Sequence, residues 1–380
     1  MASATSNSPK TITAREAADA VRAGRCVVIP TETVFGVAAD ASSDDAVRGL
    51  WSLDADSDRQ ALAWHIESAE RLVETLGAVG HRLSAVQRRL LEKLCPGPML
   101  IAVELSEAEL GTLRDHLGVG AGVVDRDGAL LVRIVANAEA QRAISEAADP
   151  LIMRAIPGGG SGARTTDEAV RAIDRLGVSD RVAGVLHSDS RPMGKSSTLV
   201  RFLSSGGYRV DREGAYAERY IDKQIMKYIL FVCTGNTCRS PMAAAIARDL
   251  VESDPLKLPV TVRSAGAFTA GGMPATPEAV TAVGSLGIEM GAHQSSVLTR
   301  EMIAQADEVY GLTASHVEAI RSIDSNAGDK VKLLDPDGRD VPDPIGHPQA
   351  VYDETAKRLR ELIALRLDAM REAEKGGATR

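Results

Sequence analysis

The chain has few aromatic residues, few cysteines and no long apolar run. Aromatic residues make up 3% of the 380 residues, which argues against an aromatic platform for single-stranded nucleic acid. The four cysteines are few for so long a chain and indicate a reducing compartment, by default the cytoplasm. No segment is apolar enough to span a membrane, and residues 1–10 lack the apolar centre of a signal peptide. A net charge of −8 with mixed signs argues against a dominant nucleic-acid-binding surface.

The most informative segment joins an apolar run to a helix-forming stretch. Residues 228–232 read as a buried parallel strand, and the alanine-rich stretch after Pro241 reads as a helix. The loop between them is Cys233-Thr234-Gly235-Asn236-Thr237-Cys238-Arg239-Ser240-Pro241. A helix N-terminus offers free N–H groups, so the amides of residues 234–239 and the Arg239 guanidinium can grip a phosphate.

The same loop offers a nucleophile. The field of the helix favours a thiolate at Cys233, and the Ser240 hydroxyl can donate to it. Gly235 and Asn236 are expected to take positive φ so that the loop closes around an anion. A bare Cys-x5-Arg spacing would favour a buried structural cysteine beside an ordinary arginine. The flanking strand, the helix and the Arg-Ser-Pro ending favour a phosphatase site instead.

A phosphocysteine enzyme also needs an acid, and two Asp-Pro pairs, at Asp335 and Asp343, lie downstream. With these features, residues from about Met226 to about Arg371 resemble the low-molecular-weight protein-tyrosine-phosphatase family. The resemblance implies a parallel sheet flanked by helices, a Cys233 nucleophile, Asp343 as the acid and no metal or cofactor. Asp335 is expected to belong to a turn.

Further stretches match the family. Residues 263–266 and 293–295, Arg-Ser-Ala-Gly and His-Gln-Ser, are expected to support the loop, or else to serve only as turn and capping residues. Thr237 and Ile345 stand where phosphotyrosine enzymes carry a bulky aliphatic and an aromatic residue, so the chain resembles the protein-arginine-phosphatase branch. That branch has Phe at the position of Ile345, which leaves phosphoarginine and phosphotyrosine both open.

Cys238 follows the nucleophile by five residues. The family resemblance implies a reversible disulfide with Cys233 that protects the nucleophile from over-oxidation. The alternative is a cysteine that merely happens to lie at the start of the helix. No cysteine follows Cys238, which argues against the arsenate reductases of the same fold.

The first half carries a separate α/β pattern. A helix near 15–23 and a strand at 26–29 precede the stretch Pro30-Thr31-Glu32-Thr33-Val34-Phe35-Gly36. Residues 95–98, 131–134 and 194–200 continue a resemblance to the threonylcarbamoyl-adenylate synthase (YrdC-like) family over about Thr11 to Gln224. It implies a twisted open sheet with a concave pocket, and threonylcarbamoyl-AMP synthesis for tRNA modification.

The departures from that family fall at its chemistry. Asp54 and Asp56 stand where the family has Lys-x-Arg, and Ala155 and Pro157 replace its Ser and Asn. Two anions would repel a triphosphate, so we expect a pseudoenzyme. The surviving pocket residues are Thr33, His65, Arg133 and Ser197. They imply a site for threonine, a nucleotide or RNA, a docking surface or a regulator, whereas a satisfied strand-end histidine and a surface arginine remain the alternative.

The sequence thus predicts a disordered tail at 1–10, a degenerate YrdC-like domain at 11–225, a phosphatase domain at 226–373 and a frayed end at 374–380. The expected activity is cytoplasmic hydrolysis of a phosphorylated protein substrate through a phosphocysteine. The alternative is a threonylcarbamoyl-AMP synthase or double-stranded-RNA-binding protein with an accessory phosphatase.

Overall fold

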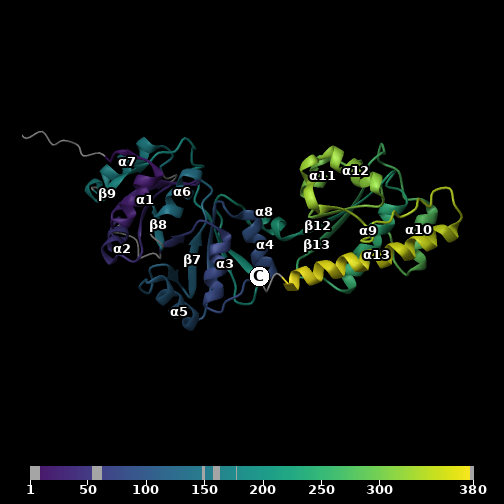
Figure 1. The fold of residues 1–380 in the computed structure, drawn as a ribbon, viewed down its shortest axis with the longest axis horizontal. Helices are drawn as coiled ribbons and strands as arrows, with labels where there is room; N and C mark the ends of the chain where they lie inside the picture. The colour runs from purple at the N-terminus through teal and green to yellow at the C-terminus, as the bar shows by residue number, and fades with distance from the viewer. Residues whose placement is uncertain (1–8, 54–61, 148–149, 157–162, 177, 377–380) are drawn as a thin grey trace, which may run out of the picture. The chain divides into compact units, whose positions relative to one another are not determined.

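The computed structural model describes residues 9–53, 62–147, 150–156, 163–176 and 178–376 (Figure 1). The chain divides into two compact units, Met1–Gln224 and Ile225–Arg380. Most of the tail expected at 1–10 and the last four residues lie outside the described residues. Within the described ranges, no helix has the length and apolar character that a membrane span requires.

The first unit is built on one mixed sheet, as the sequence predicts. Its order is β1-β9-β2-β3-β8-β4-β7-β5-β10-β11, with β6 paired to β7. The strands are β1 (Thr11–Ile12), β2 (Cys26–Pro30), β3 (Phe35–Asp40), β4 (Ala63–His65), β5 (Met99–Glu104), β6 (Asp125–Arg126), β7 (Ala129–Arg133), β8 (Leu151–Ala155), β9 (Val182–Leu186), β10 (Thr198–Phe202) and β11 (Tyr208–Arg212).

Polar caps begin the helices of this unit. The helices are α1 (Ala14–Arg22), α2 (Asp44–Trp51), α3 (Ala69–Ala78), α4 (Ala85–Leu94), α5 (Glu107–Leu117), α6 (Ala138–Glu146), α7 (Thr166–Arg175), the 3-10 turn η1 (Ser179–Arg181) and α8 (Glu218–Ile225). The side chain before each of α1 to α7 is Ser, Thr or Asn and accepts from a backbone N–H of the first turn. Helices α1 and α6 pack together over β2.

The second unit is a four-stranded parallel sheet with helices on both faces, as predicted. Its order is β13-β12-β14-β15, and every pair is parallel. The elements are β12 (Lys227–Cys233), α9 (Arg239–Ser253), β13 (Val260–Gly266), α10 (Pro277–Ser285), α11 (Arg300–Gln305), β14 (Glu308–Gly311), α12 (Ala314–Ile323), the 3-10 turn η2 (Ser325–Lys330), β15 (Val331–Leu333) and α13 (Gln349–Gly376). Helix α13 thus reaches into the stretch expected to fray.

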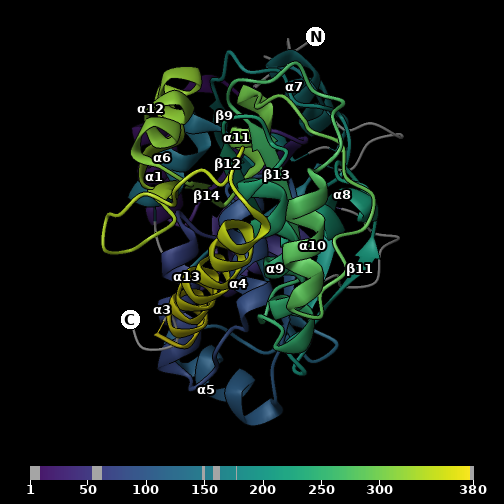
Figure 2. The ribbon, with the colours of Figure 1, turned by 90° about the vertical axis from the view of Figure 1, so that its right-hand side faces the viewer.

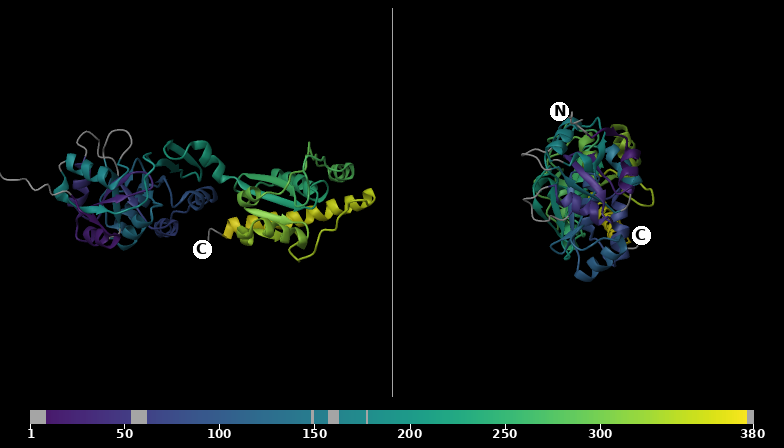
Figure 3. Two further views of the ribbon diagram at one scale, coloured as in Figure 1. Left: turned by 90° about the horizontal axis from the view of Figure 1, so that it is seen from above. Right: turned by 90° about the vertical axis from the view of Figure 1, so that its left-hand side faces the viewer.

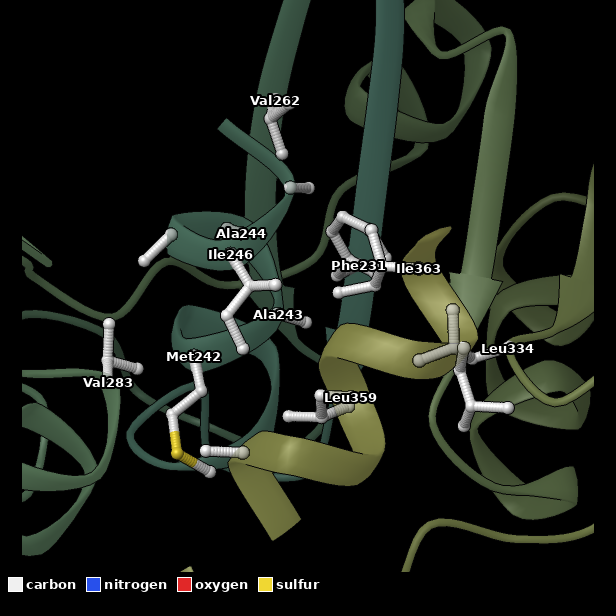
Figure 4. Close-up of a cluster of buried hydrophobic side chains, with 14 of the residues drawn as sticks. Phe231, Met242, Ala243, Ala244, Ile246, Val262, Val283, Leu334, Leu359 and Ile363 are labelled. Carbon is white, nitrogen blue, oxygen red and sulfur yellow. The ribbon is translucent and has the colours of Figure 1, made fainter. Parts of the chain in front are cut away.

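From Ile229 onward strand β12 is apolar, because both of its faces are buried there. Phe231 and Cys233 lie in a cluster with α9, α10 and α13, which contact one another (Figures 2 and 4). Leu230 and Val232 lie in a second cluster with α11 and α12. Figure 3 shows α13, in yellow, running along the sheet. The alternation places Cys233, the last residue of the strand, on the α9 side.

Candidate active site

The loop between β12 and α9 turns sharply at one residue. Asn236 has φ of 57°, which confirms the expectation for that position. Gly235 is not among the residues with positive φ, so the expectation for Gly235 was wrong. A Cβ on Gly235 would meet only the Thr237 hydroxyl, at 3.5 Å. The loop turns through the left-handed conformation of Asn236, so Gly235 does not need a positive φ.

Asn236 ties the loop together through its side chain. The amide nitrogen donates to Ser240 Oγ at 2.8 Å and to Ser264 Oγ at 2.9 Å. Its Oδ1 accepts from the backbone N–H of Ser296 at 2.8 Å. The side chain is completely buried, so these bonds fix the loop without competition from water.

The Cys233 thiol lies at the centre of this loop. Its Sγ is 3.0 Å from Ser240 Oγ and accepts from the backbone N–H of Asn236 at 3.3 Å. Cys233 is buried at the end of β12, and α9 begins at Arg239. The sulfur therefore has a hydroxyl and a backbone amide as hydrogen-bond partners, close to the start of α9.

Arg239 and Asp343 meet beside the loop. Arg239 Nη2 pairs with Asp343 Oδ2, Nη1 donates to the carbonyl of Val341 at 3.1 Å, and Nη2 also reaches Thr234 Oγ1 at 3.4 Å. The Arg239 side chain is 4% exposed and that of Asp343 is 38% exposed. A buried cation therefore holds a solvent-accessible carboxylate at the mouth of the loop.

Asp335, the other aspartate of an Asp-Pro pair, opens a turn as predicted. Its carboxylate accepts from the backbone N–H of Asp337 at 2.8 Å and from Arg358 Nη2 at 2.8 Å. Its carbonyl accepts from the backbone N–H of Gly338 at 3.2 Å. The side chain is 3% exposed, so it is sequestered from solvent.

Both stretches that were expected to support the loop contact it. Ser264 bonds Asn236 as described above, and His293 Nε2 lies 2.7 Å from the Asn236 carbonyl. Ser295 contacts a neighbouring segment instead, where its Oγ accepts from the backbone N–H of Met273. Gly266, the last residue of the first stretch, also lies directly against the loop. A Cβ there would lie 2.8 Å from the Thr234 carbonyl and 3.0 Å from the carbonyl carbon of Gly235.

His316 is a further residue that the sequence did not single out. It is 2% exposed, and its Nε2 lies 3.0 Å from Thr234 Oγ1. Burial and the charge of Arg239 lower the pKa of His316 to about 4, although Asp343 and Asp340 oppose the shift. The signal that could have indicated His316 is the group of Ser, Thr and His residues at the turn from β14 to α12.

The remaining predicted residues lie around the loop. Thr237 is half-buried, and Ile345 is 59% exposed, with its N–H donating to Asp343 Oδ1 at 3.3 Å. Cys238 is a buried free cysteine whose Sγ lies 3.7 Å from the hydroxyl of Tyr352. Thr237 thus belongs to the loop, and Ile345 belongs to the segment that carries Asp343.

The first unit contains a cavity of about 340 Å³. His65, Arg133 and Ser197 line the cavity, and the buried Thr33 contacts Arg133. Thr33 Oγ1 accepts from Arg133 Nη2 at 2.6 Å, and Glu32 pairs with the same nitrogen at 2.8 Å. The structure therefore brings together the four residues expected near this pocket.

The histidine and the arginine of this cavity have distinct surroundings. His65 Nδ1 lies 2.9 Å from the Ala63 carbonyl, and burial followed by the charge of Arg133 lowers the pKa of His65 to about 3. Arg133 Nε is buried without a hydrogen-bond partner among the described residues. Arg154 and Arg212 also line the cavity and were not foreseen. Three arginines therefore line the cavity, and one of them, Arg133, is paired with Glu32.

The residues that depart from the YrdC-like family pattern lie only partly within the described ranges. Ala155, at the position of the expected serine, lines the cavity. Asp54, Asp56 and Pro157 lie outside the described residues.

Comparison with known proteins assigns each unit. The family described as "Low molecular weight phosphotyrosine protein phosphatase" matches residues 228–375, and the Sua5_yciO_yrdC family, described as "Telomere recombination", matches residues 19–214. The chain is 42% identical over 139 residues to a protein-arginine-phosphatase of Bacillus subtilis, which covers 36% of this chain and 91% of that protein.

Two more similarities fall in the same part. A low molecular weight protein-tyrosine-phosphatase of Streptomyces coelicolor is 36% identical over 164 residues, covering 40% of this chain and 97% of that protein. The solved YwlE arginine phosphatase from Geobacillus stearothermophilus is 38% identical and covers 39% of this chain and 95% of that chain, with a TM-score of 0.36. The chain belongs to the low molecular weight protein phosphatase family through its second unit and to the Sua5/YrdC family through its first.

Proposed function

We propose that the second unit is a cysteine-dependent phosphatase that acts on a phosphorylated protein and prefers phosphoarginine. The observation that carries the proposal is the Cys233 sulfur, held between Ser240 and the Asn236 amide, with the Arg239–Asp343 pair at the mouth of the same loop. A nucleophile, an anion clamp and an acid are the groups that phosphoryl transfer through a covalent intermediate requires.

The reaction would proceed in two displacements. Cys233 Sγ attacks phosphorus, the bond from phosphorus to the leaving nitrogen or oxygen breaks, and Asp343 gives its proton to the leaving group. Asp343 then takes a proton from water, whose oxygen attacks the phosphocysteine and releases inorganic phosphate and the thiolate. Arg239 and the amides of residues 234–239 balance the charge of the equatorial oxygens in both steps.

Thr237 and Ile345 support phosphoarginine as the preferred substrate. The Thr237 hydroxyl can bond a guanidinium, and the exposed Ile345 offers no aromatic surface for a phenyl ring. Two similar proteins, from Bacillus subtilis and Geobacillus stearothermophilus, are named as protein-arginine-phosphatases.

The nucleophile is tested by Cys233→Ser in the full chain. We expect the variant to keep the wild-type melting temperature and to lose turnover of a small aryl phosphate. Turnover of the folded variant at the wild-type rate would exclude the proposed mechanism.

We propose a protective role for Cys238. Peroxide would oxidise the Cys233 thiolate to a sulfenic acid, and the Cys238 thiol would displace water to form a disulfide. Both cysteines are free and buried, and the expected reducing, cytoplasmic setting would restore them. Cys238→Ala should convert reversible inactivation by peroxide into irreversible loss, and unchanged recovery on adding a thiol would oppose the role.

For the first unit we propose a pocket that binds a small anionic ligand without adenylating it. Arg133, Arg154 and Arg212 give the cavity its charge, while Asp54 and Asp56 replace the cations expected for a triphosphate. Threonine, bicarbonate and ATP should then yield no pyrophosphate, and a thermal shift with threonine, nucleotide or RNA should identify the ligand. Pyrophosphate formation dependent on threonine would restore the synthase assignment.

A further inference from the structure

A buried histidine links the catalytic loop to a different strand-to-helix turn. His316 is the third residue of α12, and Thr313 caps that helix. His316 Nε2 lies 3.0 Å from Thr234 Oγ1, and Nδ1 lies 2.8 Å from Thr313 Oγ1. Both ring nitrogens therefore have partners, one on the catalytic loop and one on the cap of α12.

The hydrogens in this chain of bonds can be ordered in one direction. Thr234 Oγ1 accepts from Arg239 Nη2, so its own hydrogen can point to His316 Nε2. The ring hydrogen then lies on Nδ1 and points to Thr313 Oγ1, which also accepts from the backbone N–H of His316. The Thr313 hydrogen is left for Ser315 Oγ, 2.8 Å away. This order requires a neutral imidazole that accepts at Nε2.

The charges around the ring agree with that state. Arg239 of α9 faces the imidazole, and Asp340 and Asp343 approach it from the segment before α13. Burial and the nearby guanidinium disfavour a second cation, which is why the pKa of His316 falls to about 4.

We propose that His316 is a positioning residue of the phosphatase site, which fixes the Thr234 hydroxyl and through it the Arg239 guanidinium. The inference rests on the proposed function of the loop. Arg239 Nη2 is shared between Thr234 and Asp343, whereas Nη1 bonds the Val341 carbonyl. The Thr234 contact restrains the guanidinium from the loop side, so that Arg239 can bind an oxyanion when Asp343 is engaged with the leaving group.

The test measures oxyanion binding and turnover separately. Tungstate binding is measured by calorimetry and kcat/KM with an aryl phosphate, at neutral pH, for wild type, His316→Leu, Thr234→Val and the double variant. The Thr234–His316 bond is partly buried, and its loss predicts about tenfold weaker tungstate binding in each single variant. The double variant should bind about as weakly as the worse single variant, because the two side chains act through one contact.

Two further variants separate positioning from folding. In His316→Gln the amide oxygen can accept from Thr234, so we expect most of the binding to return. His187→Leu removes an exposed imidazole of the first unit and should bind tungstate like wild type. If His316→Leu does not fold, Thr234→Val and His316→Gln carry the test.

Wild-type tungstate affinity in His316→Leu, or additive losses in the double variant, would overturn the positioning role. Coupled losses of tungstate binding in a protein without phosphatase turnover would support the positioning role and count against the proposed function alone. The two failures are therefore distinguishable.

Discussion

Two aspartates, each followed by proline, have opposite surroundings. The side chain of Asp343 is 38% exposed and pairs with Arg239, whereas that of Asp335 is 3% exposed and pairs with Arg358 and Arg339. A carboxyl that exchanges protons with a leaving group must reach solvent and substrate, and a carboxyl that holds a turn need not. Exposure therefore favours Asp343 over Asp335 as the proposed acid.

Asparagine at each position tests that division. Asp343→Asn should lower kcat by about 10²–10⁴-fold, because no group then protonates the leaving atom, with little change in melting temperature. Asp335→Asn should instead cost about 1–3 kcal/mol of unfolding free energy, since its ion pairs with two arginines are lost. Steady-state kinetics and urea unfolding of both variants are the measurements. The reverse pattern, with a stable but inactive Asp335→Asn, would assign the acid to Asp335.

At this scale the sequence predicts residues whose roles are local. Asn236 could be assigned positive φ because its type tolerates that conformation, but nothing local distinguished it from Gly235. The Thr234–His316 bond joins residues 82 positions apart, and the Val341 carbonyl reaches Arg239 over 102 positions. Such contacts follow from strand order, which the local pattern does not contain.

Among elements, β12, β13 and α9 together position the loop. The apolar run before Cys233 predicted β12, and Pro241 with the alanines after it predicted α9 near its observed start at Arg239. What could not be predicted is how closely the end of β13 approaches the loop that follows Cys233. Gly266 ends β13, opposite Cys233 in the strand register, and lies against the backbone of Thr234.

Gly266→Ala should therefore displace the catalytic loop. The new Cβ would lie under 3.0 Å from the Thr234 carbonyl, so the backbone must shift, and kcat/KM should fall by up to about 100-fold. Gly284→Ala is the matched control. Gly284 lies in α10 with open space around it, so alanine there should raise stability by about 0.5–1 kcal/mol and leave kinetics unchanged. Equal kinetics of Gly266→Ala and wild type would show that the loop does not depend on this approach.

The whole molecule combines two α/β units, each with a deeply buried histidine. The two family resemblances predicted both units from separated motifs. They could not predict every crossover, such as the pairing of β1 with β9, which joins Thr11 to Val185. His65 and His316 are 4% and 2% exposed, and the pKa of each lies below the ordinary 6.5, at about 3 and about 4.

Both units should therefore lose stability as the pH falls below about 6.5. In the unfolded chain these histidines bind protons near their ordinary pKa, whereas in the folded chain they stay neutral to about pH 4 or below. The unfolded state binds more protons in that window, with a slope of up to about 1.4 kcal/mol per pH unit for each histidine. Urea unfolding at pH 7 and pH 5 measures the loss of unfolding free energy. This loss should be smaller in the double variant that combines His65→Gln and His316→Gln. Equal stability of wild type at both pH values would contradict it.

The most direct test of the central claim compares initial rates of the reduced full chain on a phosphoarginine peptide and a phosphotyrosine peptide of the same sequence context, with Cys233→Ser as the control. We predict faster hydrolysis of phosphoarginine by the wild type and none by the variant. Faster hydrolysis of phosphotyrosine would show that Thr237 and Ile345 do not set the specificity, and no wild-type activity on either peptide would contradict the assignment of a protein phosphatase site to this loop.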